Sequence, residues 1–234
     1  MSWIRLVNYQ LLQFSRSYRY FTPMALYLIV LIWIYSIIPN PVMSSYAATA
    51  IILYLISSWL GLNFYFVEPE VQQQLTIMHA RSSIHYYWSR MLTAWITTIP
   101  LSLAAVYFPM IRGAFKRHVS IGESLFVLYG HLILALLGVV LAAFLYEWFG
   151  NRFISTIGGL LLLLTLSVCS SVIGEALPAW LRPLAWLLPP AGFVMERWNT
   201  VDTAVEGAGP LLWSTLYTLV AMAGTASFMR WHRK

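Results

Sequence analysis

The sequence predicts an all-α integral membrane protein with six transmembrane helices and an amphipathic helix ahead of the first. Of its 234 residues, 60% are hydrophobic and only 9% are charged, against roughly 25% charged in soluble domains. A soluble globule of this length cannot hide so much apolar surface from water, so lipid must cover it. Eleven Trp and fourteen Tyr fit this prediction, because their rings favour the headgroup region.

Six apolar stretches are long enough to cross about 30 Å of hydrocarbon at about 1.5 Å per residue. They cover residues 20–38, 47–67, 91–111, 125–149, 154–173 and 210–229. Pro100 lies within the third, where a kink is tolerated in lipid. We expect these stretches to form one domain, residues 1–234.

The distribution of Lys and Arg predicts that both termini are cytoplasmic. In that orientation nine cations lie inside, namely Arg5, Arg16, Arg19, Arg81, Arg90, Arg152, Arg230, Arg233 and Lys234. Five lie outside, namely Arg112, Lys116, Arg117, Arg182 and Arg197. The excess follows the positive-inside rule, although the first three outside cations run against it.

Residues 1–19 read as an amphipathic helix in the membrane interface. One face carries, at helical spacing, Trp3, Leu6, Val7, Gln10, Leu11 and Phe14. Such a helix lies flat at the cytoplasmic surface and leads into the first span. The sequence leaves open whether it only anchors that span or takes part in movement.

The loop after the second span predicts a second short helix, over residues 68–83. Pro69 suits its first turn, while Glu68 and Glu70 suit its positive end. An apolar ridge follows at i, i+4 and i+7, formed by Val71, Leu75 and Met78. Few cations accompany the two carboxylates, so docking on a protein is favoured over lying flat on anionic lipid. Ser82 and Ser83 can cap the helix that follows.

The loop before the last span, residues 175–195, is apolar but too rich in Pro to cross the membrane. We expect a re-entrant hairpin dipping into the outer leaflet, because irregular backbone at that depth needs protein or a water-filled cavity around it. A lid over a cavity and an inert cap are both open. The residues that would form the lid are Pro178, Trp180, Trp186, Pro189 and Pro190.

Catalytic and metal-binding patterns are missing. The sequence has no Gly-x-x-x-x-Gly-Lys-Ser/Thr loop for nucleotide phosphates and no His-Glu-x-x-His pair for zinc. The single Cys169 excludes an intrachain disulfide, and we expect its side chain to be buried among apolar neighbours.

His131 is the one histidine within a span, and is expected to be a hydrogen-bonding surface group more often than a functional one. Glu147 and Arg152 read as a boundary pair. The net charge of +6 sits at span ends, so no nucleic-acid partner is expected.

This arrangement resembles the membrane subunit of an ABC-2-type transporter, the permease class of bacterial ATP-driven exporters. The resemblance covers nearly the whole chain: the helix at 1–19, six spans, the hairpin at 175–195, and the run Glu…Gln-Leu…Arg-Ser-Ser…Tyr-Tyr within 68–90. The family usually has a Pro soon after the first cytoplasmic helix, where this chain reads Ala80-Arg81-Ser82-Ser83.

The resemblance implies that the helix at 68–83 is a coupling helix docking on a separate cytoplasmic ATPase. Residues implied in that contact are Glu70, Val71, Gln74, Leu75, Met78 and Arg81, with the turn from Glu147 to Arg152 as a lesser contact. The hairpin would be the outer gate. The chain would be no enzyme itself and bind no cofactor, with ATP and Mg²⁺ held by two copies of the ATPase.

The implied assembly is a homodimer in lipid in the bacterial cytoplasmic membrane. Its charge-poor interior favours an amphipathic or apolar cargo, such as a peptide, an antibiotic or a lipid-like molecule. Two alternatives from other classes stay open. One is a non-transporting scaffold or immunity protein that sequesters a toxic peptide, and the other is a membrane-embedded enzyme.

Overall fold

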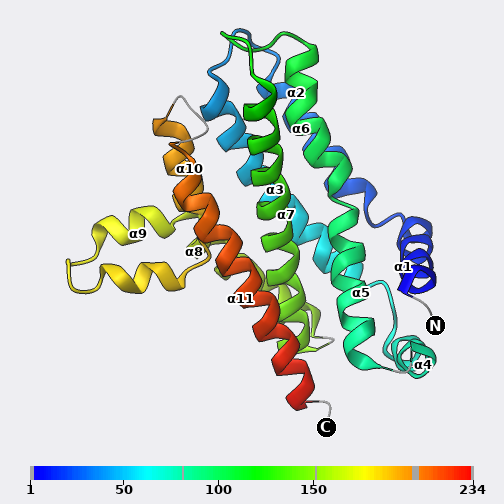
Figure 1. The fold of residues 1–234 in the computed structure, drawn as a ribbon. Coiled ribbons are helices and arrows are strands. Elements are labelled where there is room, and N and C mark those ends of the chain that lie inside the picture. Colours follow the sequence, from blue (N-terminus) through cyan, green and yellow to red (C-terminus); the bar gives the residue numbers. More distant parts are fainter. Residues whose placement is uncertain (1–2, 81, 151, 202–205, 233–234) are drawn as a thin grey trace.

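The structure is a computed structural model that describes residues 3–80, 82–150, 152–201 and 206–232. Within these ranges all regular elements are helices (Figure 1), apart from one isolated bridge between Asn40 and Phe115. Four helices are long and apolar enough to cross a membrane, or six if each of two bent helix pairs counts as one span. The predicted helical membrane fold is confirmed at this level.

Two helices form the centre of the bundle, α3 (Val42–Tyr65) and α7 (Ile121–Phe149). They approach closely because glycines lie at their contact. A Cβ on Gly138 would collide with the Tyr54 carbonyl and the Ser57 hydroxyl, and one on Gly61 would press on Val139. Small residues permit such close backbone packing in membrane bundles. The helices α2, α5, α6, α8, α10 and α11 all contact this central pair.

The surrounding helices are α2 (Phe21–Ile34), α5 (Ser83–Ile96) continuing into α6 (Ile99–Ile111), α8 (Phe153–Val168) and α11 (Ala208–His232). Together α5 and α6 make one candidate span of 29 residues, with Pro100 in the first turn of α6. That span begins at Ser83, not at 91 as predicted. The Ser82 hydroxyl accepts a hydrogen bond from the His85 N–H and starts the helix early.

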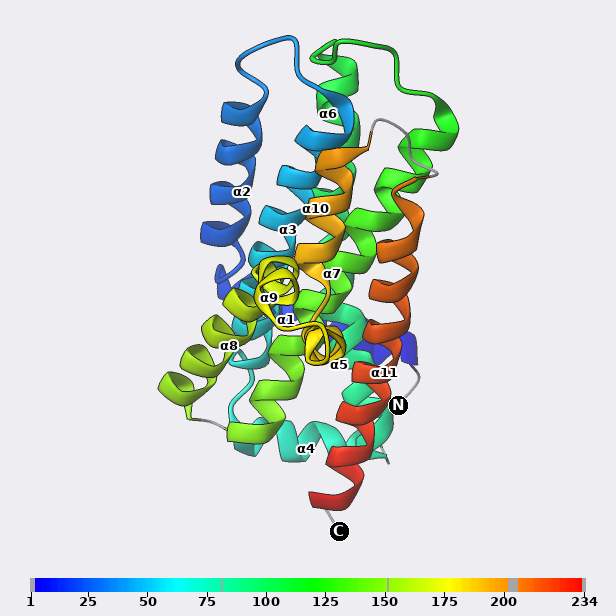
Figure 2. The same ribbon diagram turned by 90° about the vertical axis from the view of Figure 1, so that its left-hand side faces the viewer.

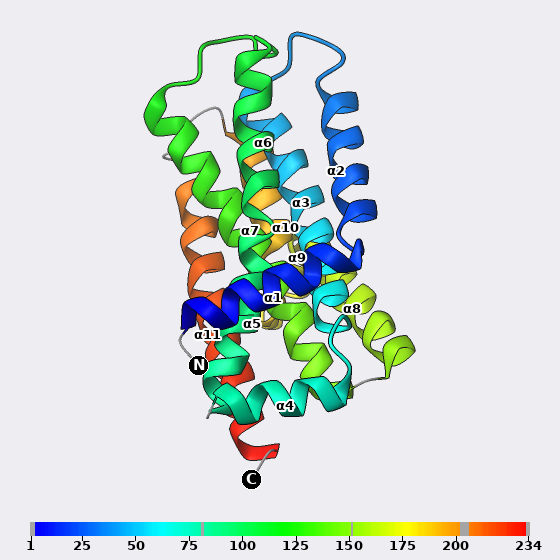
Figure 3. The ribbon, with the colours of Figure 1, turned by 90° about the vertical axis from the view of Figure 1, so that its right-hand side faces the viewer.

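Two short helices lie across the side of the bundle in Figure 3, α1 (Trp3–Ser17) a little below its mid-height and α4 (Glu70–Ala80) near its lower end. A bend of 78° separates α1 from α2. The α1 helix packs on α5, where the buried Gln10 amide donates to Ser89 and its carbonyl accepts from Thr93. The amphipathic helix at the N-terminus is thus bound to the bundle through its buried face. We call this end of the molecule the α4 end.

The fifth predicted span, 154–173, is broken. Here α8 is only 16 residues, about 24 Å long. A bend of 61° leads to α9 (Ser170–Ala176), a turn and the 3₁₀ helix η1 (Arg182–Leu187). The chain then continues in α10 (Ala191–Thr200), which packs against α3. The α9–η1 hairpin projects from the bundle at about half its height (Figure 1), and α10 carries the chain on toward the end opposite α4 (Figure 2).

The hairpin formed by α9 and η1 overlaps the re-entrant hairpin predicted for residues 175–195. Sequence alone read residues 175–195 as a loop beyond a complete span. In the structure Pro189 and Pro190 connect η1 to α10, and α10 returns to pack against α3. The Ser167 hydroxyl donates to the Pro189 carbonyl at 2.9 Å and so closes the base of the hairpin.

Candidate functional site

The apolar ridge of α4 is exposed. Val71 is 72% exposed, Leu75 49% and Met78 65%, although these are the residue types that folding usually buries. Nothing else in the described part of the chain covers them. Figure 3 shows α4 at the edge of the molecule, with α1 and α5 on its inner side. The arrangement presents three apolar side chains in a row on a helix outside the candidate spans.

The opposite face of α4 is fixed to the bundle by Glu68. This carboxylate is only 6% exposed. It accepts one hydrogen bond from the Thr76 hydroxyl in α4, at 2.8 Å, and another from the Tyr86 hydroxyl in α5. A buried carboxylate is stable only when its oxygens are satisfied in this way. Glu68 therefore joins α4 to α5, a role that the sequence analysis missed when it assigned Glu68 to the positive end of the helix.

A second contact joins α4 to α1. The Gln72 amide donates to the Tyr9 hydroxyl at 2.6 Å. Beside it, Leu6 of α1, Ala80 of α4 and Tyr86 of α5 form a small apolar cluster. The three helices at this end thus form one packed unit, so a force on α4 reaches α5 through both polar and apolar contacts.

One turn and a little further along α5, Arg90 lies in a cage of tyrosine rings. Its guanidinium carbon is 4.4 Å from the ring centre of Tyr65, 5.2 Å from Tyr146 and 5.4 Å from Tyr86. These distances are those of cation–π contacts. Arg90 is 2% exposed, and its Nη2 donates to the Tyr65 carbonyl at 2.7 Å. The cage links α5 to the ends of α3 and α7.

Arg90 also corrects the sequence analysis, which counted it among the loop cations that set orientation. The early start of α5 carries it into a candidate span, where it is buried. Its Nη1 has no hydrogen-bond partner among the described residues. A buried cation at a span end is a functional candidate by default. The available signal was the capping residue Ser82, which starts this helix ahead of Arg90.

The other residues of the implied coupling contact lie at the same end. Glu70 is exposed in the first turn of α4, and Gln74 is exposed beside the ridge. Glu147 lies in the last turn of α7, and the exposed Arg152 immediately precedes α8. Figure 1 shows the end of α7 at the same end of the bundle as α4, with α5 between the two. Arg81 lies outside the described residues.

The residues of the implied outer gate are distributed over the α9–η1 hairpin and its base. Trp180 at the tip is 78% exposed, and Trp186 is 57% exposed. The Trp186 ring packs edge-on against Trp213 of α11, with ring centres 5.2 Å apart. Pro178 begins the turn after α9, while Pro189 and Pro190 connect η1 to α10. The hairpin is therefore attached at its base and free at its tip.

Two predictions about single residues were wrong. His131 is fully buried, not a surface group, and its ring nitrogens pair with the Val127 carbonyl at 2.9 Å and the Thr49 hydroxyl at 3.1 Å. Cys169, expected to be buried, is exposed where α8 bends into α9. In both cases apolar sequence context did not reveal which helix face meets a neighbour.

In the described part of the chain, no group of three or more His, Cys, Asp or Glu side chains is placed to hold a metal ion. Comparison with protein-family models, with curated proteins and with solved structures finds no match to this chain.

Proposed function

We propose that the chain is the membrane subunit of an ABC-2-type exporter, acting as a homodimer with two copies of a cytoplasmic ATPase. The cargo would be amphipathic or apolar. The observation that carries this proposal is the exposed ridge of α4, held rigidly against the bundle by Glu68. An apolar row on a well-fixed helix suits insertion into a groove of a protein partner.

In this proposal ATP binding closes the partner ATPase and displaces α4. Because Glu68 and Tyr86 tie α4 to α5, the displacement passes to α5. The Arg90 cage then carries it to the ends of α3 and α7. Coupling of this kind requires a bundle with two arrangements that both sites bias.

The first test is purification of the tagged protein from its native cells in detergent, with identification of the proteins that accompany it. We expect a P-loop ATPase at one copy per chain. Leu75→Asp should abolish its association and the ATP hydrolysis that the membrane subunit stimulates, because a charge would be placed in an apolar contact.

Leu75→Met is the matched control, since it keeps the ridge apolar and should retain the partner. Equal elution of both variants as folded protein excludes a folding defect. A wild type that purifies alone would reject the exporter and favour the scaffold or immunity protein. Retention of the ATPase by Leu75→Asp would reject α4 as the docking helix.

A further inference from the structure

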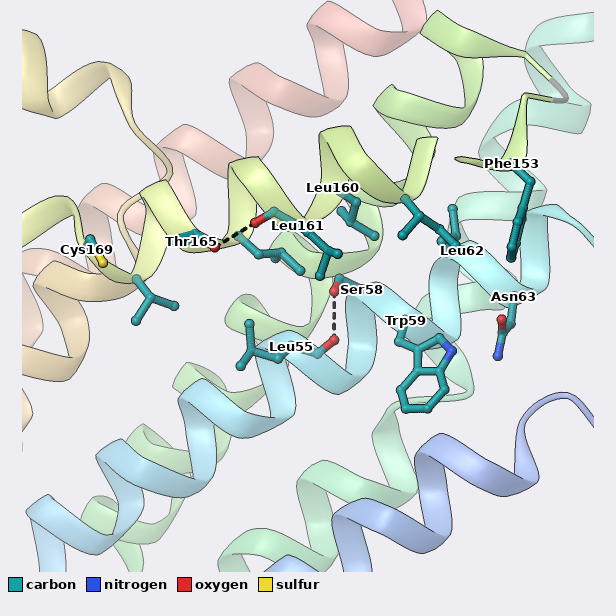
Figure 4. A pocket seen from close by; sticks show the side chains of 13 residues that line it. Leu55, Ser58, Trp59, Leu62, Asn63, Phe153, Leu160, Leu161, Thr165 and Cys169 are labelled. Carbon is teal, nitrogen blue, oxygen red and sulfur yellow. Dashed lines mark hydrogen bonds between the residues drawn. The ribbon is translucent and has the colours of Figure 1, made fainter. Parts of the chain in front are cut away.

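An apolar groove runs along the bundle between α3 and α8, well away from the α4 ridge. Its volume is about 690 Å³. It is lined from α3 by Leu55, Trp59 and Leu62, and from α8 by Ile157, Leu161 and Leu164. The groove exists because α8 leans away from α3, as Figure 4 shows from close by. Both walls belong to helices that form candidate spans, α8 as half of a bent pair.

The two hydroxyl groups in the wall do not make the groove polar. The Ser58 hydroxyl donates to the Leu55 carbonyl at 2.7 Å, and the Thr165 hydroxyl donates to the Leu161 carbonyl at 2.8 Å (Figure 4). Both are therefore satisfied within their own helices. Their protons are therefore not available to an occupant, and the rest of the wall between α3 and α8 is mostly hydrocarbon, which matches an acyl chain.

The groove changes character at the end nearer α4. A second cavity, of about 540 Å³, shares Trp59, Asn63 and Phe153 with the first. It adds Arg19 and Thr22. No carboxylate is among the described residues that line either cavity. The two cavities thus form one continuous surface, which is apolar between α3 and α8 and polar at the end that contains Arg19. We call this end the mouth of the groove.

Arg19 is held in place at this mouth. Its Nη1 donates to the Phe66 carbonyl at 2.8 Å. The side-chain amide of Asn63 donates to the backbone carbonyl of Arg19 at 2.9 Å. The first bond uses one of the five N–H groups of the guanidinium. The others suit a phosphate, which Arg binds with two parallel hydrogen bonds.

We propose that this groove binds an anionic phospholipid, with an acyl chain between α3 and α8 and the phosphate at Arg19. The assignment rests on two observations. The groove is apolar along its length and has a cation, Arg19, at one end, and that cation lies at a defined place in the fold. Arg19 lies at the bend between α1 and α2, where an interfacial helix meets a span, and this is the depth of lipid headgroups. The proposal does not depend on the exporter function.

The test is native mass spectrometry of the delipidated protein, titrated with phosphatidylglycerol or phosphatidylcholine of identical acyl chains. We expect the wild type to retain phosphatidylglycerol about fivefold better, the factor that one basic residue contributes near an anionic headgroup. Arg19→Gln should bring this ratio close to one. Arg16→Gln, which alters another exposed arginine at the same end, should leave it unchanged.

A second pair of variants tests the acyl chain site. Leu161→Trp fills the groove and should remove both lipids, whereas Leu162→Trp should not. The two leucines are neighbours in α8 with 60% and 62% exposure, and only Leu161 lines the groove. This match makes a folding defect common to both variants easy to recognise.

Equal retention of the two lipids by the wild type would overturn the proposal, as would equal loss in both tryptophan variants. The exposed Cys169 is the single cysteine of the chain and also lines the groove. Cross-linking of two chains through it by a short bis-maleimide, with lipid binding unchanged in Leu161→Trp, would show that a second copy occupies the groove and would likewise overturn the proposal.

Discussion

At the scale of single residues, the least expected feature is a cation buried among tyrosine rings. Arg90 is stabilised by one carbonyl and by the faces of Tyr65, Tyr86 and Tyr146. A planar guanidinium can lie against several rings at once, whereas an ammonium group is compact and strongly hydrated. The residue type at position 90 is therefore as important as its charge.

We predict that Arg90→Lys lowers the stability of the protein by about 2 kcal/mol, because the stacking contacts are lost while a charge stays buried. Thermal unfolding in detergent should show a decrease in Tm of about 5 °C. Arg5→Lys, at an exposed position of α1, is the control and should not change Tm. Equal Tm values for both variants would contradict a structural role for the cage.

At the scale of elements, α4 combines an exposed ridge with a firmly bonded inner face. The ridge follows directly from helical periodicity. The inner face depends on Glu68, which precedes the helix and reaches both Thr76 and Tyr86. A helix of 11 residues has little stability of its own. These bonds are thus what keep α4 in one orientation.

Thr76→Val should release α4 from Glu68. A hydrogen bond to a charged group contributes about 1.5–3 kcal/mol, so amide hydrogen exchange in α4 should accelerate about tenfold or more. Glu70→Gln, which changes an exposed carboxylate of the same helix, should alter exchange by less than about threefold. Unchanged exchange in Thr76→Val would mean that apolar packing alone holds α4.

At the scale of the whole molecule, the proposed orientation places α1, α4 and the last turn of α7 in or near the cytoplasm. The chain offers a direct test because it contains only two lysines, Lys116 and Lys234. They lie on opposite sides of the membrane in the proposed topology, since the positive-inside rule puts the C-terminal tail in the cytoplasm.

A membrane-impermeant amine reagent should therefore label Lys116 in intact cells and Lys234 only in inverted vesicles. Mass spectrometry of the labelled peptides separates the two sites from each other and from the N-terminal amine. Lys116→Arg should remove the labelling of intact cells. Labelling of Lys234 in intact cells would reverse the topology and place α4 on the outside.

The sequence by itself determined the membrane class, the all-helical fold, the apolar ridge at Val71, Leu75 and Met78, and the Ser82 cap, because hydropathy, periodicity and capping are local properties of the chain. Tertiary structure decided the rest. Burial of Arg90, the bridging role of Glu68 and the groove beside Arg19 depend on which helix faces meet, and those pairs are distant in sequence. The break in the fifth span was decided in the same way, since the 61° bend between α8 and α9 lies within an apolar run and packing of α10 on α3 then returns the chain to the bundle.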